Sequence, residues 1–154
     1  MADDIDEWIS FHVLAGVKHF YLYDNASVDG TAERALAHAT GEVTVTVHPW
    51  QLRPLVVKEG RWKRPEVAAQ ELAYAHAVLN YGGRHQWMSF IDIDEFLVPV
   101  RHATLPEALE QLRDFSNISL PWHSFGDCGH QTRPPGPAVY AYRLRHQLSG
   151  SEVD

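Results

Sequence analysis

Three acidic residues, Asp92, Asp94 and Glu95, lie inside an otherwise apolar stretch, residues 87–100 (WMSFIDIDEFLVPV). If residues 86–91 form a strand, the alternation of side chains places both aspartates on one side and the neighbouring isoleucines on the other. Two residues of a strand span roughly 6.6 Å, so both carboxylates can hold one hard cation, directly or through water. Carboxylates in an apolar segment are costly unless they are paired, hydrogen-bonded or bound to a metal. The stretch is therefore a candidate metal site.

A purely structural role is the alternative for these acids. Acidic residues at the end of a buried strand often cap the helix or turn that follows. The combination Asp-Ile-Asp-Glu, with apolar residues on both sides, favours the metal for Asp92 and Asp94. Glu95 is open to both interpretations, as a third metal ligand or as a cap for the next segment.

The composition narrows the class of protein. The chain has 154 residues, which suits one domain with a real core, and 45% of them are hydrophobic, as in globular α/β proteins. Its formal charge of −7 argues against a nucleic-acid surface. The only cysteine, Cys128, permits no internal disulfide and fits a reducing compartment. With no apolar run of membrane-spanning length and no signal peptide, we expect a soluble, cytoplasmic protein.

Helical and strand patterns alternate along the chain, which predicts an α/β fold with a largely parallel sheet. The expected helix at residues 65–81 carries the broadest apolar face, with Val67, Leu72, Tyr74, Ala75, Val78 and Leu79 on it. The other expected helices run from an N-cap at Asp3 or Asp4 to Gly16, from the turn at Thr31 through Ala39, and from a capping box formed by Thr104 and Glu107. Strands are expected at residues 19–23, 42–48, 86–91, 118–122 and 138–144.

Two polar clusters follow strands in this scheme. Asp24 and Asn25 come directly after the strand at residues 19–23, and Asp92 and Asp94 follow another. In open parallel sheets, ligands bind outside the carboxyl ends of the strands. If the two strands are neighbours, both clusters lie on one rim and form a single site.

Several segments resemble, in order and spacing, glycosyltransferase family 92 and the related family 2-like glycosyltransferases. The resemblance covers nearly the whole chain, and the first and third of the following segments are specific in combination. The segments are YDNASVDGT (residues 23–31), Gln70 with Ala73 and Tyr74, WMSFIDIDEFLVP (87–99), the opening DEWISFHVLAGVKHFYLYDN (6–25), and WHSFGDCGH (122–130).

The resemblance implies an A-type glycosyltransferase fold, a Rossmann-like sheet that binds a nucleotide sugar. Asp92 and Asp94 would be its Asp-x-Asp motif and would hold a Mn²⁺ or Mg²⁺ ion on the diphosphate of the donor. This agrees with the chemistry, because a divalent cation neutralises the leaving diphosphate. The residues implied in donor binding are Asp24, facing the base or ribose, Asn25, Asp29, Gln70, Tyr74 and Asp92.

Two later residues are weaker candidates. His130 can be an additional metal ligand, since neutral imidazole suits Mn²⁺, or an ordinary surface or core histidine. Asp127 is the best-placed candidate for a catalytic base, or a turn residue. Family members usually begin with an additional strand and continue further, so we expect the chain to be incomplete at both ends, which allows for a piece that is inactive by itself.

The leading functional hypothesis is a metal-dependent glycosyltransferase. It would move a sugar from a nucleoside-diphosphate donor to the hydroxyl of a carbohydrate or other acceptor, with inversion. One alternative is a metal-dependent phosphoryl-transfer enzyme or phosphohydrolase, but the sequence shows no further acidic group with the spacing that this needs. The other alternative is a carbohydrate- or nucleotide-binding remnant without catalysis. The sequence does not determine the oligomeric state.

Overall fold

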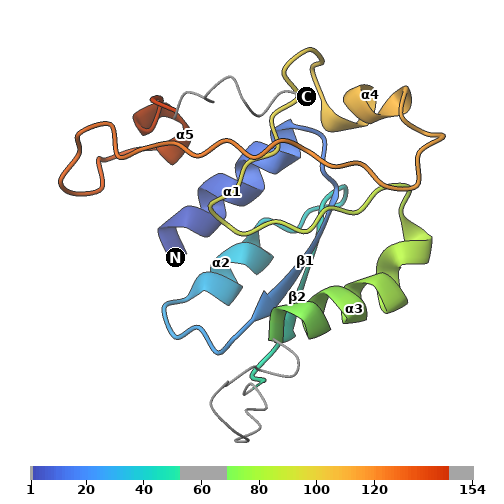
Figure 1. Cartoon of the computed structure of the whole chain (residues 1–154). Coiled ribbons are helices and arrows are strands. Elements are labelled where there is room, and N and C mark those ends of the chain that lie inside the picture. Colours follow the sequence, from blue (N-terminus) through green and yellow to red (C-terminus); the bar gives the residue numbers. More distant parts are fainter. Residues whose placement is uncertain (1, 53–68, 146–154) are drawn as a thin grey trace, which may run out of the picture. The chain divides into compact units, whose positions relative to one another are not determined.

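The structure, a computed structural model, describes residues 2–52 and 69–145 (Figure 1). It divides into two compact units, Met1–Glu110 and Gln111–Asp154, and the expected single domain stays a prediction. In chain order the elements are α1 (Ala2–Leu14), β1 (His19–Asp24), α2 (Thr31–Ala37), β2 (Thr44–Pro49), α3 (Ala69–Tyr81), a 3₁₀ turn (Gly82–Arg84), α4 (Leu105–Glu110) and, in the second unit, α5 (Ala138–Ala141).

The sheet of the first unit consists of β1 and β2, which run parallel (Figure 1). His19 lies opposite Thr44, and Asp24 lies opposite Pro49. The mixed α/β class and these two strands are confirmed. The remaining three strand predictions are wrong within the described chain: residues 86–91 and 118–122 have no regular structure, and residues 138–141 form α5.

One face of the sheet forms the core with α1 and α2 (Figure 1). Phe20 is buried on this face. Because the side chains of a strand alternate between its two faces, the next side chain of β1, Tyr21, points to the other face. The buried members of the core are Ile5, Trp8, Ile9, Phe20, Ala35 and Val43, with Val13, Val17, Leu22, Val45, Val47, Ile91, Ile93 and Phe96 packed around them.

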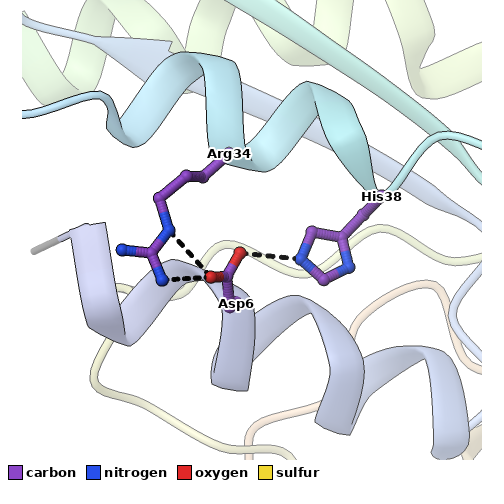
Figure 2. A network of polar contacts seen from close by, with 3 residues as sticks. All are labelled: Asp6, Arg34 and His38. Carbon is purple, nitrogen blue, oxygen red and sulfur yellow. Dashed lines mark hydrogen bonds and ion pairs between the residues drawn. The ribbon is translucent and has the colours of Figure 1, made fainter.

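α1 and α2 are also joined by a polar network (Figure 2). The Asp6 carboxylate on α1 accepts hydrogen bonds from Nε and Nη2 of Arg34 and from Nε2 of His38, the last at 2.9 Å. The His38 hydrogen bond, supported by the hydrogen bond and charge of Arg34, holds the pKa of Asp6 below its usual 3.8, although burial acts the other way. The network therefore favours the packed arrangement of the two helices while Asp6 is ionised.

Gly16 ends α1 in a Schellman motif, as its sequence position predicted. Gly16 has a φ of +97°, its N–H donates to Val13 O at 3.0 Å, and Val17 N–H donates to His12 O at 2.8 Å. The start of the helix differs from the prediction: α1 begins at Ala2, so Asp3 and Asp4 lie in its first turn and neither is the N-cap.

Replacing Gly16 with alanine is expected to lower the free energy of unfolding by about 2 kcal/mol, since a left-handed φ strains any residue with a Cβ. A Cβ at this position would also lie 2.9 Å from Pro106 Cδ, at the start of α4. Urea denaturation measures the change. Gly41→Ala is the matched control, because Gly41 has no positive φ and its Cβ would meet no atom within 4 Å. Equal stability of the two variants would contradict this account.

The capping box of α4 forms, with one shift. Thr104 Oγ1 accepts the Glu107 N–H at 3.4 Å, while Glu107 Oε2 accepts the N–H of Ala103 at 3.1 Å, one residue earlier than the N-cap. Leu105 N–H donates to Ala15 O at 2.8 Å, which holds the start of α4 against the end of α1.

The other face of the sheet carries tyrosine and histidine side chains and is covered by α3 (Figure 1). Burial lowers the pKa of His48 and, together with the charges of His19 and Arg84, that of His85, so both are neutral near pH 7 and can accept from a tyrosine O–H. Three tyrosine–histidine pairs, each with 2.8 Å between oxygen and nitrogen, join the sheet to α3 and the turn after it: Tyr21 with His85, Tyr23 with His76, and Tyr81 with His48.

The buried face of α3 differs from the predicted one. Leu72, Val78 and Leu79 are 42%, 52% and 85% exposed, whereas Ala73 and Ala77 are buried. The helix carries apolar residues on several sides, so its pattern alone does not define a face. The side chains of His76 and Tyr81, which contact Tyr23, Tyr21 and His48 of the sheet, show which side of the helix faces it. The predicted start of this helix, residues 65–68 with Val67, lies outside the described residues.

The second unit is mostly irregular. Phe125 and Arg145 form an isolated antiparallel bridge, and Gly126 N–H donates to Leu144 O at 2.9 Å. Cys128 Sγ accepts the N–H groups of Arg143 and Leu144, each at 3.2 Å. The cysteine is thus a structural residue of this loop. No helix in the described part of either unit is both long and apolar enough to cross a membrane.

Candidate functional site

Residues 92–95 form a turn, which we call the acidic turn. Glu95 N–H donates to Asp92 O at 3.0 Å, and Glu95 Oε2 accepts the Asp92 N–H, also at 3.0 Å. The expected strand before it is wrong: among the described residues the sheet contains only β1 and β2, and residues 86–91 pair with neither. The expected alternation nevertheless holds: Ile91 and Ile93 pack on the core, and Asp92 and Asp94 are exposed.

The acidic turn is anchored to α1 by two hydrogen bonds. Trp8 Nε1 donates to Glu95 O at 2.9 Å, and the N–H of Leu97 donates to His12 Nε2 at 3.2 Å. Phe96, between these two bonds, stacks on the His12 ring with 5.9 Å between centroids and meets Phe11 edge to face at 5.1 Å. The backbone on the carboxyl side of the aspartates is therefore fixed by the core.

His12 holds this contact as a neutral imidazole. Its side chain is buried, at 1% exposure, and desolvation lowers its pKa despite the hydrogen bond to the Trp8 carbonyl. The 2.8 Å bond from Nδ1 to Trp8 O needs a proton on Nδ1, which leaves Nε2 free of a proton and able to accept from Leu97. Both ring nitrogens are satisfied in one tautomer.

On its other side the acidic turn meets α3. Gln70 Nε2 donates to Tyr74 Oη at 2.7 Å and, at the longer distance of 3.4 Å, to Asp92 Oδ1. The Tyr74 ring lies 4.5 Å from the ring of Phe90, which comes two residues before Asp92. The structure thus brings three of the predicted donor-binding residues together, and their roles stay predictions.

The carboxyl end of β1 is linked to this group through Trp50. The backbone N–H of Trp50 donates to Asp24 O at 2.7 Å, and its indole Nε1 donates to Ala69 O at 2.8 Å, beside Gln70. A series of hydrogen bonds therefore runs from Asp24 through Trp50 and the start of α3 to Asp92. The backbone of Asp24 is thus connected to the neighbourhood of Asp92, while a single site formed by the side chains of both clusters stays a prediction.

The side chains of the segment after β1 make local contacts. Both Asp24 carboxylate oxygens accept the Ser27 N–H, at 3.1 and 3.3 Å. Asp29 Oδ1 accepts from Thr31, from N at 3.2 Å and from Oγ1 at 2.6 Å, while Asn25 is exposed. These bonds shape the turn into α2, and nucleotide binding by the three residues remains a prediction.

Asp127 and His130 share a turn in the second unit. Asp127 Oδ1 accepts the N–H of Gly129 at 2.9 Å, and its carbonyl accepts the His130 N–H at 3.0 Å. The His130 ring meets the ring of Tyr142 at 6.0 Å, perpendicular to it. The turn role that the sequence allowed for Asp127 is present, while its role as a base and metal binding by His130 stay predictions.

The donor set of the acidic turn fits a hard cation. Within residues 2–52 and 69–145, no three His, Cys, Asp or Glu side chains come together as a metal site. The two exposed aspartates suffice for Mg²⁺ or Mn²⁺, which proteins often hold with one or two carboxylates while water and substrate phosphates fill the other positions.

Sequence reasoning missed the residues that position the acidic turn. Trp8 and His12 lie in the helix expected from Asp3 or Asp4 to Gly16, and the sequence pattern gives no role to them, to Trp50 or to Phe90. For Phe90 a signal was present, because it is in phase with Asp92 and Asp94 in the alternating stretch. Trp8 and His12 lie more than 80 residues away from their partners, and no local pattern identifies such a contact.

Residues 2–148 match the family model described as Glycosyltransferase family 92. The chain is similar to glycosyltransferase family 92 proteins of Ricinus communis (28% identical over 157 residues, 95% of this chain), Oryza sativa subsp. japonica (30% over 145 residues, 90%) and Arabidopsis thaliana (27% over 150 residues, 90%). It spans 22–25% of the length of these relatives. No solved structure matches the chain.

Proposed function

Because the chain belongs to glycosyltransferase family 92, as its residue pattern predicted, we propose that it contains the donor-binding part of a metal-dependent glycosyltransferase. The donor is a nucleoside-diphosphate sugar, and the acceptor is the hydroxyl of a carbohydrate or another molecule. The fold of the whole domain is the A-type glycosyltransferase fold, of which β1 and β2 are two parallel strands.

The observation that supports this proposal most is the position of Asp92. Its carboxylate is exposed on a turn anchored to the core, and it faces Gln70 and Tyr74 on α3. A carboxylate on an anchored turn, with a polar neighbour on a second element, is suited to a ligand that carries both a cation and hydrogen-bonding groups. A metal-bound nucleoside diphosphate is such a ligand.

In the proposed reaction, Asp92 and Asp94 would hold Mn²⁺ or Mg²⁺, which would supply charge neutralisation for the leaving diphosphate. The Gln70 amide, hydrogen-bonded to Tyr74, orients the Asp92 carboxylate. Glu95 holds the Asp92 N–H and keeps the turn closed. Asp24, Asn25 and Asp29 bind the nucleoside.

The transfer step needs a base, and Asp127 is our candidate. As the acceptor oxygen bonds to the anomeric carbon, the bond from that carbon to the diphosphate oxygen breaks, and the nucleoside diphosphate leaves with the electron pair. The acceptor proton passes to the Asp127 carboxylate. Attack from the side opposite the leaving group inverts the configuration.

Calorimetric titration with UDP, GDP, ADP and CDP, in Mn²⁺ and in EDTA, tests the proposal. At least one nucleoside diphosphate should bind about tenfold more tightly, or more, in Mn²⁺ than in EDTA, because the cation offsets the repulsion between carboxylates and diphosphate. The matching monophosphate is the control and should show a much weaker metal dependence. Equal affinity with and without Mn²⁺ for every diphosphate would refute metal-dependent donor binding.

A further inference from the structure

Phe90 and Tyr74 form a two-ring surface, which we call the aromatic pair. Their centroids lie 4.5 Å apart and the ring planes are tilted by 38°. Phe90 is 40% exposed, whereas Phe20 in the same unit is buried in the core. The pair therefore combines a ring fixed on α3 with one that presents much of its surface to solvent.

The aromatic pair lies beside the acidic turn. Phe90, Asp92 and Asp94 are all exposed, while the isoleucines between them pack on the core. Two residues of chain span at most about 7 Å, so the ring of Phe90 is near any diphosphate that the Asp92 carboxylate holds through a cation. The nucleobase of a nucleoside diphosphate is separated from its phosphates only by the ribose, so it can reach this surface.

The edge of the pair is polar. The Tyr74 hydroxyl accepts from Gln70 Nε2 at 2.7 Å and keeps its own O–H as a donor. The Gln70 amide makes both of its bonds, to Tyr74 and to Asp92, through its nitrogen, and its carbonyl oxygen is the acceptor at this edge. An exposed aromatic ring with a donor and an acceptor beside it matches a nucleobase, which has a π-face and polar groups in its plane. A sugar ring carries hydroxyls around its whole circumference and fits such a surface less well.

We propose that the nucleobase of the donor stacks on the exposed ring of Phe90, with Tyr74 beside it, which makes Phe90 a determinant of nucleotide affinity. This inference rests on the proposed function, because it takes the diphosphate to be bound at Asp92. It assigns a role to a residue for which the sequence pattern gave none.

The test compares Phe90→Leu with the wild-type chain in Mn²⁺, using the nucleoside diphosphate that binds best and inorganic diphosphate. Loss of the ring should weaken binding of the nucleoside diphosphate about tenfold, since stacking of one base on an aromatic ring accounts for a change of this order. Binding of inorganic diphosphate should not change. Phe90→Tyr should retain the wild-type affinity.

Phe115→Leu is the matched control. It makes the same change of side chain at an exposed phenylalanine of the second unit, where Phe115 is 60% exposed. Its affinities should equal those of the wild type. Saturation-transfer NMR on the bound nucleotide adds an independent measurement: the base protons should receive the strongest saturation, and Phe90→Leu should reduce it.

Three outcomes would overturn the inference alone. The first is an unchanged affinity of Phe90→Leu for the nucleoside diphosphate. The second is an equal loss of affinity for inorganic diphosphate, which would place the effect at the acidic turn. The third is a loss of affinity only for the complete nucleotide sugar, which would place the sugar on the rings. A wild-type chain that binds no nucleoside diphosphate in Mn²⁺ would overturn the proposed function, and this inference with it.

Discussion

Replacing Asp92 with asparagine is expected to lower metal-dependent turnover of the donor about 100- to 1000-fold, the range seen when one charge-stabilising group is removed from an active site. Asparagine has nearly the same shape and keeps an oxygen toward Gln70, so the change removes the negative charge and little else. The measurement is release of nucleoside diphosphate from the nucleotide sugar at several Mn²⁺ concentrations.

Two comparisons make this result specific. Asp114→Asn, the same change at an exposed aspartate of the second unit, should leave turnover and metal dependence unchanged. The melting temperature of Asp92→Asn should stay close to that of the wild type, because Asp92 is exposed. A variant that keeps wild-type turnover with the same Mn²⁺ dependence would show that Asp92 is no metal ligand in the reaction.

Replacing His12 with leucine is expected to lower the free energy of unfolding by about 3 kcal/mol. Leucine fills much of the same space but makes neither the bond to Trp8 O nor the bond from Leu97 N–H, so it leaves the half-buried N–H of Leu97 without this partner. Urea denaturation at pH 7.5 measures the loss. His123→Leu, at a half-buried histidine in the irregular second unit, is the control and should change stability much less.

The stability of the wild type and that of His12→Leu should also depend differently on pH. Burial lowers the pKa of His12 in the folded chain from its ordinary 6.5, so between these two values the unfolded chain binds more protons than the folded one. The free energy of unfolding of the wild type should therefore fall as the pH drops below 6.5. Its slope should be smaller in His12→Leu, although not zero, because burial also lowers the pKa of His48 and His85. Identical slopes in both proteins would contradict a buried neutral His12.

Part of the site could be predicted from local sequence. The alternation of apolar and acidic residues from Ile91 to Asp94 was sufficient to place the isoleucines on the core and the aspartates in solvent. The alternating valines of β2 predicted that strand for the same reason, since a two-residue period describes one buried face. The polar turn after β1 marked the end of the other strand. These features depend on the local sequence and not on a segment that is distant in the chain.

What could not be predicted depends on partners distant in the chain. The apolar run before Asp92 has the composition of a strand, but a strand needs a neighbour to accept its hydrogen bonds, and composition does not say whether one is present. The orientation of α3 was missed likewise, because it depends on the pairing of His76 and Tyr81 with side chains of the sheet, and these partners lie more than 30 residues away in the chain. Trp8 and His12 gave no sign of a role at the acidic turn.

The bonds from α1 to the acidic turn also govern the order of events during synthesis. Trp8 and Glu95 are 87 residues apart, and a ribosome that adds 5–20 residues per second needs about 4–17 s to cover this interval. Throughout that time Trp8 Nε1 and His12 Nε2 lack the partners, Glu95 O and Leu97 N–H, that they have in the folded chain. Chaperones that bind apolar helices on emerging chains have this interval in which to act, and synthesis that stops before Glu95 leaves the helix without its final contacts.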